Sequence, residues 1–79
     1  MLKIYGSMNC RTCIQCRKEL DMEGVPYIYL DLADSVKNLR EFLFIRDNTP
    51  HLFDEIKAEG RIGIPCIIRE DGTVTLSWD

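Results

Sequence analysis

The chain has 79 residues, of which 46% are hydrophobic and 29% are charged, and it carries a formal net charge of -3 at pH 7. This length allows one domain with one small core, over residues 1–79, and the composition is that of a folded protein rather than a disordered one. The acidic balance, with lysines and arginines scattered among the acids, disfavours nucleic acid as a partner.

The first third of the chain predicts a strand, a helix and a second strand. Residues 2–5 are short, apolar and β-prone, which predicts a buried strand. Apolar residues at helical spacing predict a helix over about residues 10–22, with Gly24 as its stop. Residues 25–30 contain β-branched and aromatic residues around an early proline, Pro26, and predict the second strand.

The middle of the chain predicts two consecutive helices. Residues 31–35 contain acids and a serine that can cap a helix over about residues 36–46. In residues 48–50 the asparagine suits a left-handed stop, the threonine an N-cap, and the proline the first position of a third helix that runs to Gly60. We place the one histidine, His51, in the first turn of that helix, exposed to solvent.

The last third of the chain predicts a hairpin. Residues 61–65 suit a loop, and residues 66–69 and 73–78 suit strands joined by a tight turn at Asp71-Gly72. The expected order is strand, helix, strand, helix, helix, strand, strand. A strand-helix-strand unit requires a parallel pair and a hairpin requires an antiparallel pair, so we expect an α+β fold with a four-stranded mixed sheet.

The strand tyrosines and the only tryptophan are interpreted as packing residues, and Trp78 could cover either the sheet edge or the cysteine loop. The chain opens without the length or flanks of a secretory signal, and its apolar runs are short. We therefore expect a cytoplasmic monomer without membrane contact. In that reducing compartment, its four cysteines are expected to be catalytic thiols or metal ligands rather than structural disulfides.

Two of these cysteines, Cys10 and Cys13, are separated by two residues at the predicted start of the first helix. Unpaired N–H groups and the helix dipole favour a thiolate there, and thiols in such sites reach pKa values of roughly 3.5–7.5. The neighbouring Arg11 adds a positive charge. We expect Cys10 to attack a disulfide and Cys13, one helical turn later, to resolve the mixed disulfide.

A family resemblance supports this interpretation. Residues 5–7, leading into Cys10-Arg11-Thr12-Cys13 and followed about fifty residues later by Gly63-Ile64-Pro65, resemble a glutaredoxin of the thioredoxin superfamily over nearly the whole chain. The resemblance implies a thioredoxin-like fold and a thiol-disulfide oxidoreductase. It implies that Pro65 is cis and faces the dithiol, and that the backbone of Ile64 pairs with a disulfide substrate. It also implies that Arg11 and Thr12 contact the substrate.

The chain departs from this family at several positions. Arg11-Thr12 replaces the usual Pro-Tyr between the cysteines, and Ser7 stands where glutathione-binding members commonly have a lysine. Residues 76–79 replace the expected Gly-Gly and aspartate, so we expect the family's C-terminal helix to be absent. Glutathione is therefore one candidate co-substrate, and a thioredoxin-reductase-like flavoprotein is the other candidate reductant. The oxidised partner would be a disulfide-containing protein or a low-molecular-weight disulfide.

The remaining cysteines leave alternatives open. Cys16 either fills the core or exchanges disulfides with Cys13, and Cys66 lies either near the dithiol or in the core, so both are candidate accessory thiols. A rival interpretation is a zinc or iron–sulfur module that uses all four cysteines, and a third is a redox-sensing adaptor. On a continuous helix, however, Cys10 and Cys16 lie ~9 Å apart in rise and ~120° apart in rotation. We therefore expect no metal and no tightly bound cofactor.

Overall fold

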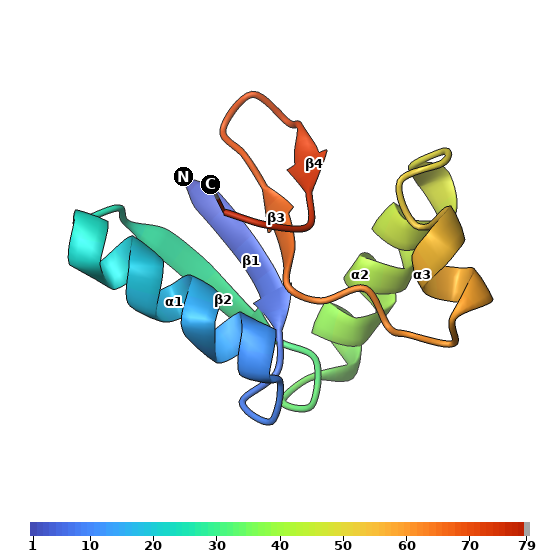
Figure 1. Ribbon diagram of the computed structural model, residues 1–79, viewed down its shortest axis with the longest axis horizontal. Helices are drawn as coiled ribbons and strands as arrows, with labels where there is room; N and C mark the ends of the chain where they lie inside the picture. Colours follow the sequence, from blue (N-terminus) through green and yellow to red (C-terminus); the bar gives the residue numbers. More distant parts are fainter. Residues whose placement is uncertain (79) are drawn as a thin grey trace.

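Strand β1, Leu2–Gly6, lies at the centre of the sheet. It pairs in parallel with β2, Tyr27–Asp31, and antiparallel with β3, Cys66–Ile68, and β3 pairs antiparallel with β4, Val74–Thr75. The computed structural model describes residues 1–78, and its strands follow the spatial order β2-β1-β3-β4 (Figure 1). The predicted α+β class, mixed four-stranded sheet and element order are confirmed.

Helices cover both faces of this sheet. Helix α1, Arg11–Glu23, lies on one face, and helices α2, Val36–Asn48, and α3, Asp54–Ala58, lie on the other (Figure 1). The predicted caps of the first two helices are confirmed. Gly24 ends α1 in the left-handed region at φ 70°, and the Ser35 Oγ accepts the first-turn N–H of α2 at 3.3 Å.

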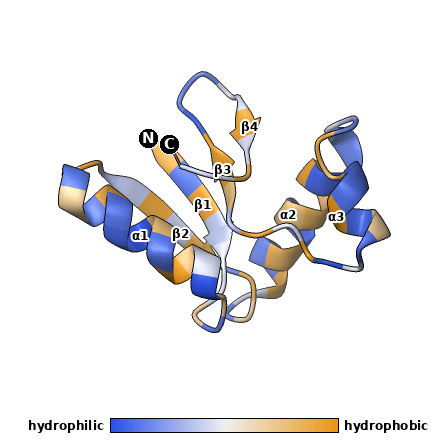
Figure 2. Ribbon diagram, viewed as in Figure 1, coloured by the Kyte–Doolittle hydropathy of each residue, from blue (hydrophilic) through white to orange (hydrophobic). Residues whose placement is uncertain are grey.

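Alternate residues of each strand point to opposite faces, and this alternation creates two core clusters. The α1-side cluster consists of Leu2, Ile4, Cys16, Leu20 and Ile67. The α2-side cluster consists of Tyr5, Phe42, Phe53 and Cys66. In Figure 2 most of α1 is hydrophilic whereas β3 is hydrophobic along its length, as expected for a strand with helices over both faces.

The junction between α2 and α3 differs from the prediction. Asn48 is helical and Thr49 is the C-cap of α2, and their side chains donate to carbonyls four residues earlier at 2.8 and 2.6 Å. These side chains therefore satisfy the end of α2 instead of starting a new helix. Pro50 and His51 lie in turns, with His51 exposed at φ 70°, and α3 spans only residues 54–58. The predicted third helix over 50–60 was too long at both ends.

The C-terminal hairpin forms as predicted, but its second strand is short. Gly72, at φ 88°, donates its N–H to the Arg69 carbonyl at 2.9 Å and closes the turn. Strand β4 ends at Thr75 rather than continuing to Trp78. The Trp78 side chain packs against the α1-side cluster, and its indole N–H donates to the Glu23 carboxylate at 3.1 Å. Trp78 therefore contacts the C-terminal end of α1, the end opposite Cys10.

None of the helices described within residues 1–78 has both the length and the apolar character needed to cross a bilayer.

Candidate functional site

The site begins where the chain leaves β1 and enters α1. Cys10 is the N-cap of α1, with extended backbone angles of φ -98° and ψ 116°. Its backbone N–H donates to the Ser7 carbonyl at 3.3 Å, so the intervening turn holds the cysteine at the carboxyl end of β1. The Cys13 N–H donates to the Cys10 Sγ at 3.2 Å. The Cys10 sulfur therefore takes the place of a capping oxygen at the positive end of the helix.

Hydrogen bonds lower the pKa of Cys10. Partial burial raises it, but this effect is outweighed by donors from the Cys13 thiol, the Thr12 hydroxyl and the backbone N–H groups of both residues. The Thr12 Oγ1 lies 3.2 Å from the Cys10 Sγ. Cys10 is partly exposed, so this thiol of lowered pKa is also accessible from solvent.

Cys13 has the opposite environment. Its side chain has no exposed surface, and burial followed by its hydrogen bond to Cys10 raises the pKa of the Cys13 thiol to about 12. Two thiols one helical turn apart therefore have pKa values shifted in opposite directions, lowered for Cys10 and raised for Cys13. Such a difference in pKa between neighbouring groups is typical of groups with different roles in one reaction.

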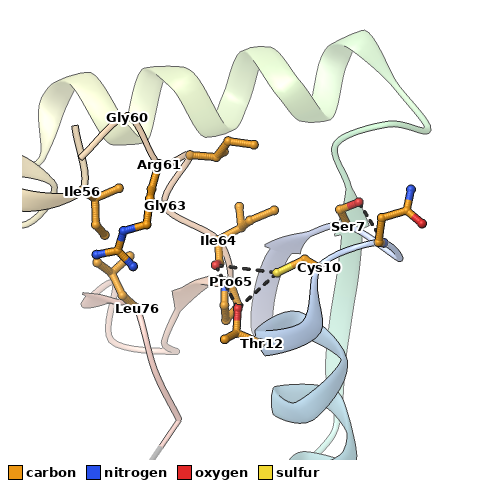
Figure 3. Close-up of a pocket in the computed structure, with 12 residues that line it drawn as sticks. Ser7, Cys10, Thr12, Ile56, Gly60, Arg61, Gly63, Ile64, Pro65 and Leu76 are labelled. Atoms are coloured by element: carbon orange, nitrogen blue, oxygen red, sulfur yellow. Dashed lines mark hydrogen bonds between the residues drawn. The ribbon is translucent and has the colours of Figure 1, made fainter. Parts of the chain in front are cut away.

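The loop before β3 lies opposite Cys10. The Ile64 carbonyl is 3.9 Å from the Cys10 Sγ and 3.5 Å from the Thr12 Oγ1, and the Ile64–Pro65 bond is cis, as the resemblance implied. Figure 3 shows Cys10 pointing toward Ile64 and Pro65, with Arg61 and Leu76 farther along the wall. Between them lies an open cleft of about 740 Å³. Its lining residues are Ser7, Asn9, Cys10, Thr12, Ile56, Gly60, Arg61, Ile62, Gly63, Ile64, Pro65 and Leu76.

The structure brings together three of the four residues that are predicted to contact the substrate. Thr12, Ile64 and Pro65 line the cleft beside Cys10. The fourth, Arg11, is exposed on the first turn of α1 and is not part of the lining. Arg11 therefore makes no contact with the Cys10 sulfur.

Arg61 is a cleft residue that the sequence analysis missed. Its guanidinium Nε lies 2.7 Å from the Glu59 Oε1, and both side chains are mostly exposed. The sequence feature that could have identified Arg61 is its position two residues before Gly63, at the start of the loop that faces the cysteines. Tyr29 was interpreted only as a packing residue, yet its hydroxyl donates to the Ser7 carbonyl at 3.1 Å, beside the dithiol.

The other two cysteines lie in different cores. Cys16 belongs to the α1-side cluster, and Cys66 belongs to the α2-side cluster, across the sheet. Burial raises the pKa of both thiols, that of Cys66 to about 12. Cys66 therefore lies in the core, in the cluster on the α2 side of the sheet. Within residues 1–78, no three His, Cys, Asp or Glu side chains are close enough to hold a metal ion, so the four cysteines do not converge as the metal-site interpretation requires.

Comparisons with known proteins identify one relative but no activity. No protein-family model matches the chain, and no solved structure matches it. The chain is 40% identical over 58 residues to a protein of Haemophilus influenzae that is described only as uncharacterized. The match covers 73% of this chain and 66% of that protein, so the chain spans just under two thirds of its relative's length.

Proposed function

We propose that this protein is a thiol-disulfide oxidoreductase of the dithiol glutaredoxin type, built on a thioredoxin-like fold. The observation that carries this proposal is the pairing of an accessible Cys10 of lowered pKa with a buried Cys13 of raised pKa at the start of one helix. A nucleophile must be a thiolate and within reach of its substrate, whereas a resolving thiol must wait until the mixed disulfide has formed.

The arrangement of the sheet supports the proposed fold. A parallel pair, β1 and β2, continued by two antiparallel strands agrees with the thioredoxin-like fold that the sequence resemblance implies. The same arrangement puts the loop before β3 across the cleft from Cys10, within 3.9 Å at Ile64. A disulfide lying in the cleft would therefore have the Cys10 sulfur on one side and the backbone of the loop before β3 on the other.

The proposed reaction proceeds in two exchanges. The Cys10 thiolate attacks one sulfur of the substrate disulfide, forms a mixed disulfide and releases the other sulfur as a thiolate. Cys13 then loses its proton to solvent and attacks the Cys10 Sγ, which breaks the mixed disulfide and releases the second substrate thiolate. The substrate gains two electrons, and the protein is left with a Cys10–Cys13 disulfide.

An external reductant must then restore the dithiol. We propose that glutathione or a thioredoxin-reductase-like flavoprotein supplies the two electrons, and that the protein acts as a cytoplasmic monomer without a tightly bound cofactor. The polar side chain of Ser7 lines the cleft at the position where glutathione-binding relatives commonly have a lysine. The flavoprotein therefore remains a full alternative as donor.

Single-cysteine variants test the proposal. We expect Cys10→Ser to lower disulfide-reductase activity by roughly a hundredfold or more, because the attacking sulfur is lost. Cys13→Ser should still form a mixed disulfide, detected by intact mass, but should not release the second thiolate intramolecularly. Cys66→Ala serves as the matched control because Cys66 lies across the sheet. Full activity in Cys10→Ser, or alkylation of Cys10 at about pH 6 no faster than that of an ordinary thiol, contradicts the proposal.

A further inference from the structure

The absence of a side chain at Gly6 allows Cys13 and Tyr29 to lie close together. Gly6 ends β1, and a Cβ atom at that position would lie 2.5 Å from the Tyr29 hydroxyl and 3.1 Å from the Cys13 Sγ. The hydroxyl and the sulfur therefore share the small space that glycine leaves open. Any larger residue at position 6 would displace one of them.

Tyr29 is held in this space from two directions. It pairs with Ile4 in the parallel β1–β2 ladder, and its ring packs against the α1-side cluster. The Arg17 guanidinium lies over the ring, 4.1 Å from its centroid. At its tip, the Tyr29 hydroxyl donates to the Ser7 carbonyl at 3.1 Å. These contacts hold the ring in place with its hydroxyl beside the dithiol, and Tyr29 is not among the residues that line the cleft.

The buried position of Cys13 creates a need for such a donor. Cys13 must become a thiolate to attack the mixed disulfide, yet its side chain has no exposed surface. Burial and the hydrogen bond to Cys10 raise its pKa, whereas hydrogen bonds from the Ser7 backbone and the Tyr29 hydroxyl lower it. Once Cys10 is bonded to substrate, its charge no longer opposes ionisation of Cys13, and these two donors face the new thiolate.

We propose that the Tyr29 hydroxyl turns from the Ser7 carbonyl to the Cys13 sulfur as Cys13 ionises, and thereby accelerates resolution of the mixed disulfide. This inference rests on the proposed function. Tyr29 keeps its proton throughout: the Cys13 proton passes to solvent, the bond from Cys13 to Cys10 forms, and the bond from Cys10 to the substrate sulfur breaks. Tyr29 is thus a hydrogen-bond donor to the resolving thiolate and not a base.

The charged groups around Tyr29 agree with this role. Burial and the neighbouring Cys13 raise the pKa of the Tyr29 hydroxyl, Arg17 lowers it, and Asp31 on the same strand raises it. The net effect is a pKa above the ordinary value, so the hydroxyl stays protonated and able to donate wherever Cys13 reacts. Arg17 polarises the ring and strengthens the hydroxyl as a donor.

A single-turnover reaction separates the two exchanges. The reduced protein, at low concentration and in slight excess, is mixed with dithiobis(nitrobenzoate), an aromatic disulfide that releases one coloured thiolate in each exchange. The first release reports the attack by Cys10 and depends on protein concentration. The second reports the intramolecular attack by Cys13, is independent of concentration, and should be absent in Cys13→Ser.

We expect Tyr29→Phe to alter only the second release. Loss of a donor to a charged sulfur should raise the pKa of Cys13 in the mixed disulfide by about one unit, so the second release should need a higher pH to reach a given rate, measured between about pH 6 and 10. Near neutral pH the rate should fall only about threefold, because the rarer thiolate is also more nucleophilic. The matched control is Tyr5→Phe, whose hydroxyl lies on the other side of the sheet and donates to Glu41 at 3.2 Å. It should leave both releases unchanged.

Several outcomes overturn the inference. The inference fails if Tyr29→Phe matches the wild type in the second release, or if it slows both releases equally, which would indicate altered packing. If the wild type itself shows no rapid first release, the proposed function fails, and this inference fails with it. Arg17→Gln provides a second variant on the partly exposed face of α1. It should slow the second release in the wild type but add nothing in Tyr29→Phe, and equal effects in both backgrounds contradict the role of the hydroxyl.

Discussion

Cys10 and Cys13 have the same side chain, and their environments alone give them different chemistry. Cys10 occupies a helix N-cap, where N–H groups converge on its sulfur, including that of Cys13 at 3.2 Å. Cys13 lies one turn later on the inner face of the same helix, with no exposed surface and with a pKa raised to about 12 by burial. The difference follows from helix geometry, because the first turn leaves its N–H groups unpaired and the next turn does not.

Thr12 is the side chain whose removal tests the stabilisation of Cys10. Its Oγ1 lies 3.2 Å from the Cys10 Sγ, and Thr12→Val removes the hydroxyl while keeping a similar shape. Because a donor to the thiolate is lost, we expect the pKa of Cys10 to rise and its alkylation at about pH 6 to slow several-fold. The pH profile of alkylation by iodoacetamide measures this. Thr12→Ser keeps the hydroxyl and should behave like the wild type, and identical profiles for all three proteins would contradict the role of Thr12.

At the residue scale, the sequence predicts the roles of the two thiols better than it predicts the groups that surround them. The spacing of Cys10 and Cys13 at the start of a helix was sufficient to assign their roles as a hypothesis. The contact of Tyr29 with Cys13 was not predictable, because it depends on the register of β2 against β1 and on the absence of a side chain at Gly6. A tyrosine in an apolar strand gives no sign of where its hydroxyl will reach.

At the scale of elements, the loop before β3 is positioned by contact with α3. Gly63 has φ 100°, and a Cβ atom there would lie 2.8 Å from the Phe53 ring. Phe53 is buried in the α2-side cluster and immediately precedes α3. The close approach of Gly63 to this ring sets where Ile64 and Pro65 lie relative to Cys10.

Gly63→Ala should therefore disturb both stability and activity. The left-handed backbone costs any L-residue about 1–2 kcal/mol, and overpacking against Phe53 adds roughly 1–3 kcal/mol. Gly60→Ala is the matched control, because Gly60 has φ 73° but open space around its Cβ position. We expect urea unfolding to show a larger loss for Gly63→Ala and turnover to fall about tenfold in that variant alone. Equal losses in the two variants would show that backbone strain, and not the contact with Phe53, dominates.

The elements also show where sequence patterns are ambiguous. Gly24 was correctly predicted as the end of α1, and Ser35 is the one of the candidate caps in residues 31–35 that caps α2. At the end of α2, Asn48 and Thr49 are compatible both with ending one helix and with starting another. The structure uses their side chains to satisfy α2 carbonyls, and His51 then takes the left-handed turn that had been assigned to Asn48. Local sequence cannot distinguish these uses, because the same residue types suit both of them.

At the scale of the whole molecule, the sheet divides the thiols into two groups. Cys10, Cys13 and Cys16 lie on or under α1, whereas Cys66 lies in the α2-side cluster with Phe42 and Phe53. The sequence could not assign Cys66 to either face, because a strand's alternation is known only once its register is known. Its place in the α2-side cluster makes Cys66 a structural residue whose ionisation affects the stability of the fold.

Cys66→Ala should make stability less sensitive to alkaline pH. Burial raises the folded-state pKa of Cys66 to about 12, whereas an unfolded thiol ionises near ~8.5. Between these values only the unfolded state loses the proton, so ionisation of Cys66 lowers the free energy of unfolding by about 1.4 kcal/mol for each pH unit. Below ~8.5 the thiol is protonated in both states, and the stability from burying it is fully present. Urea unfolding under reducing conditions should show this slope lost in Cys66→Ala. Cys10→Ala is the control, since a lowered folded-state pKa contributes no slope above ~8.5. An unchanged slope in Cys66→Ala would mean that its thiol ionises without unfolding.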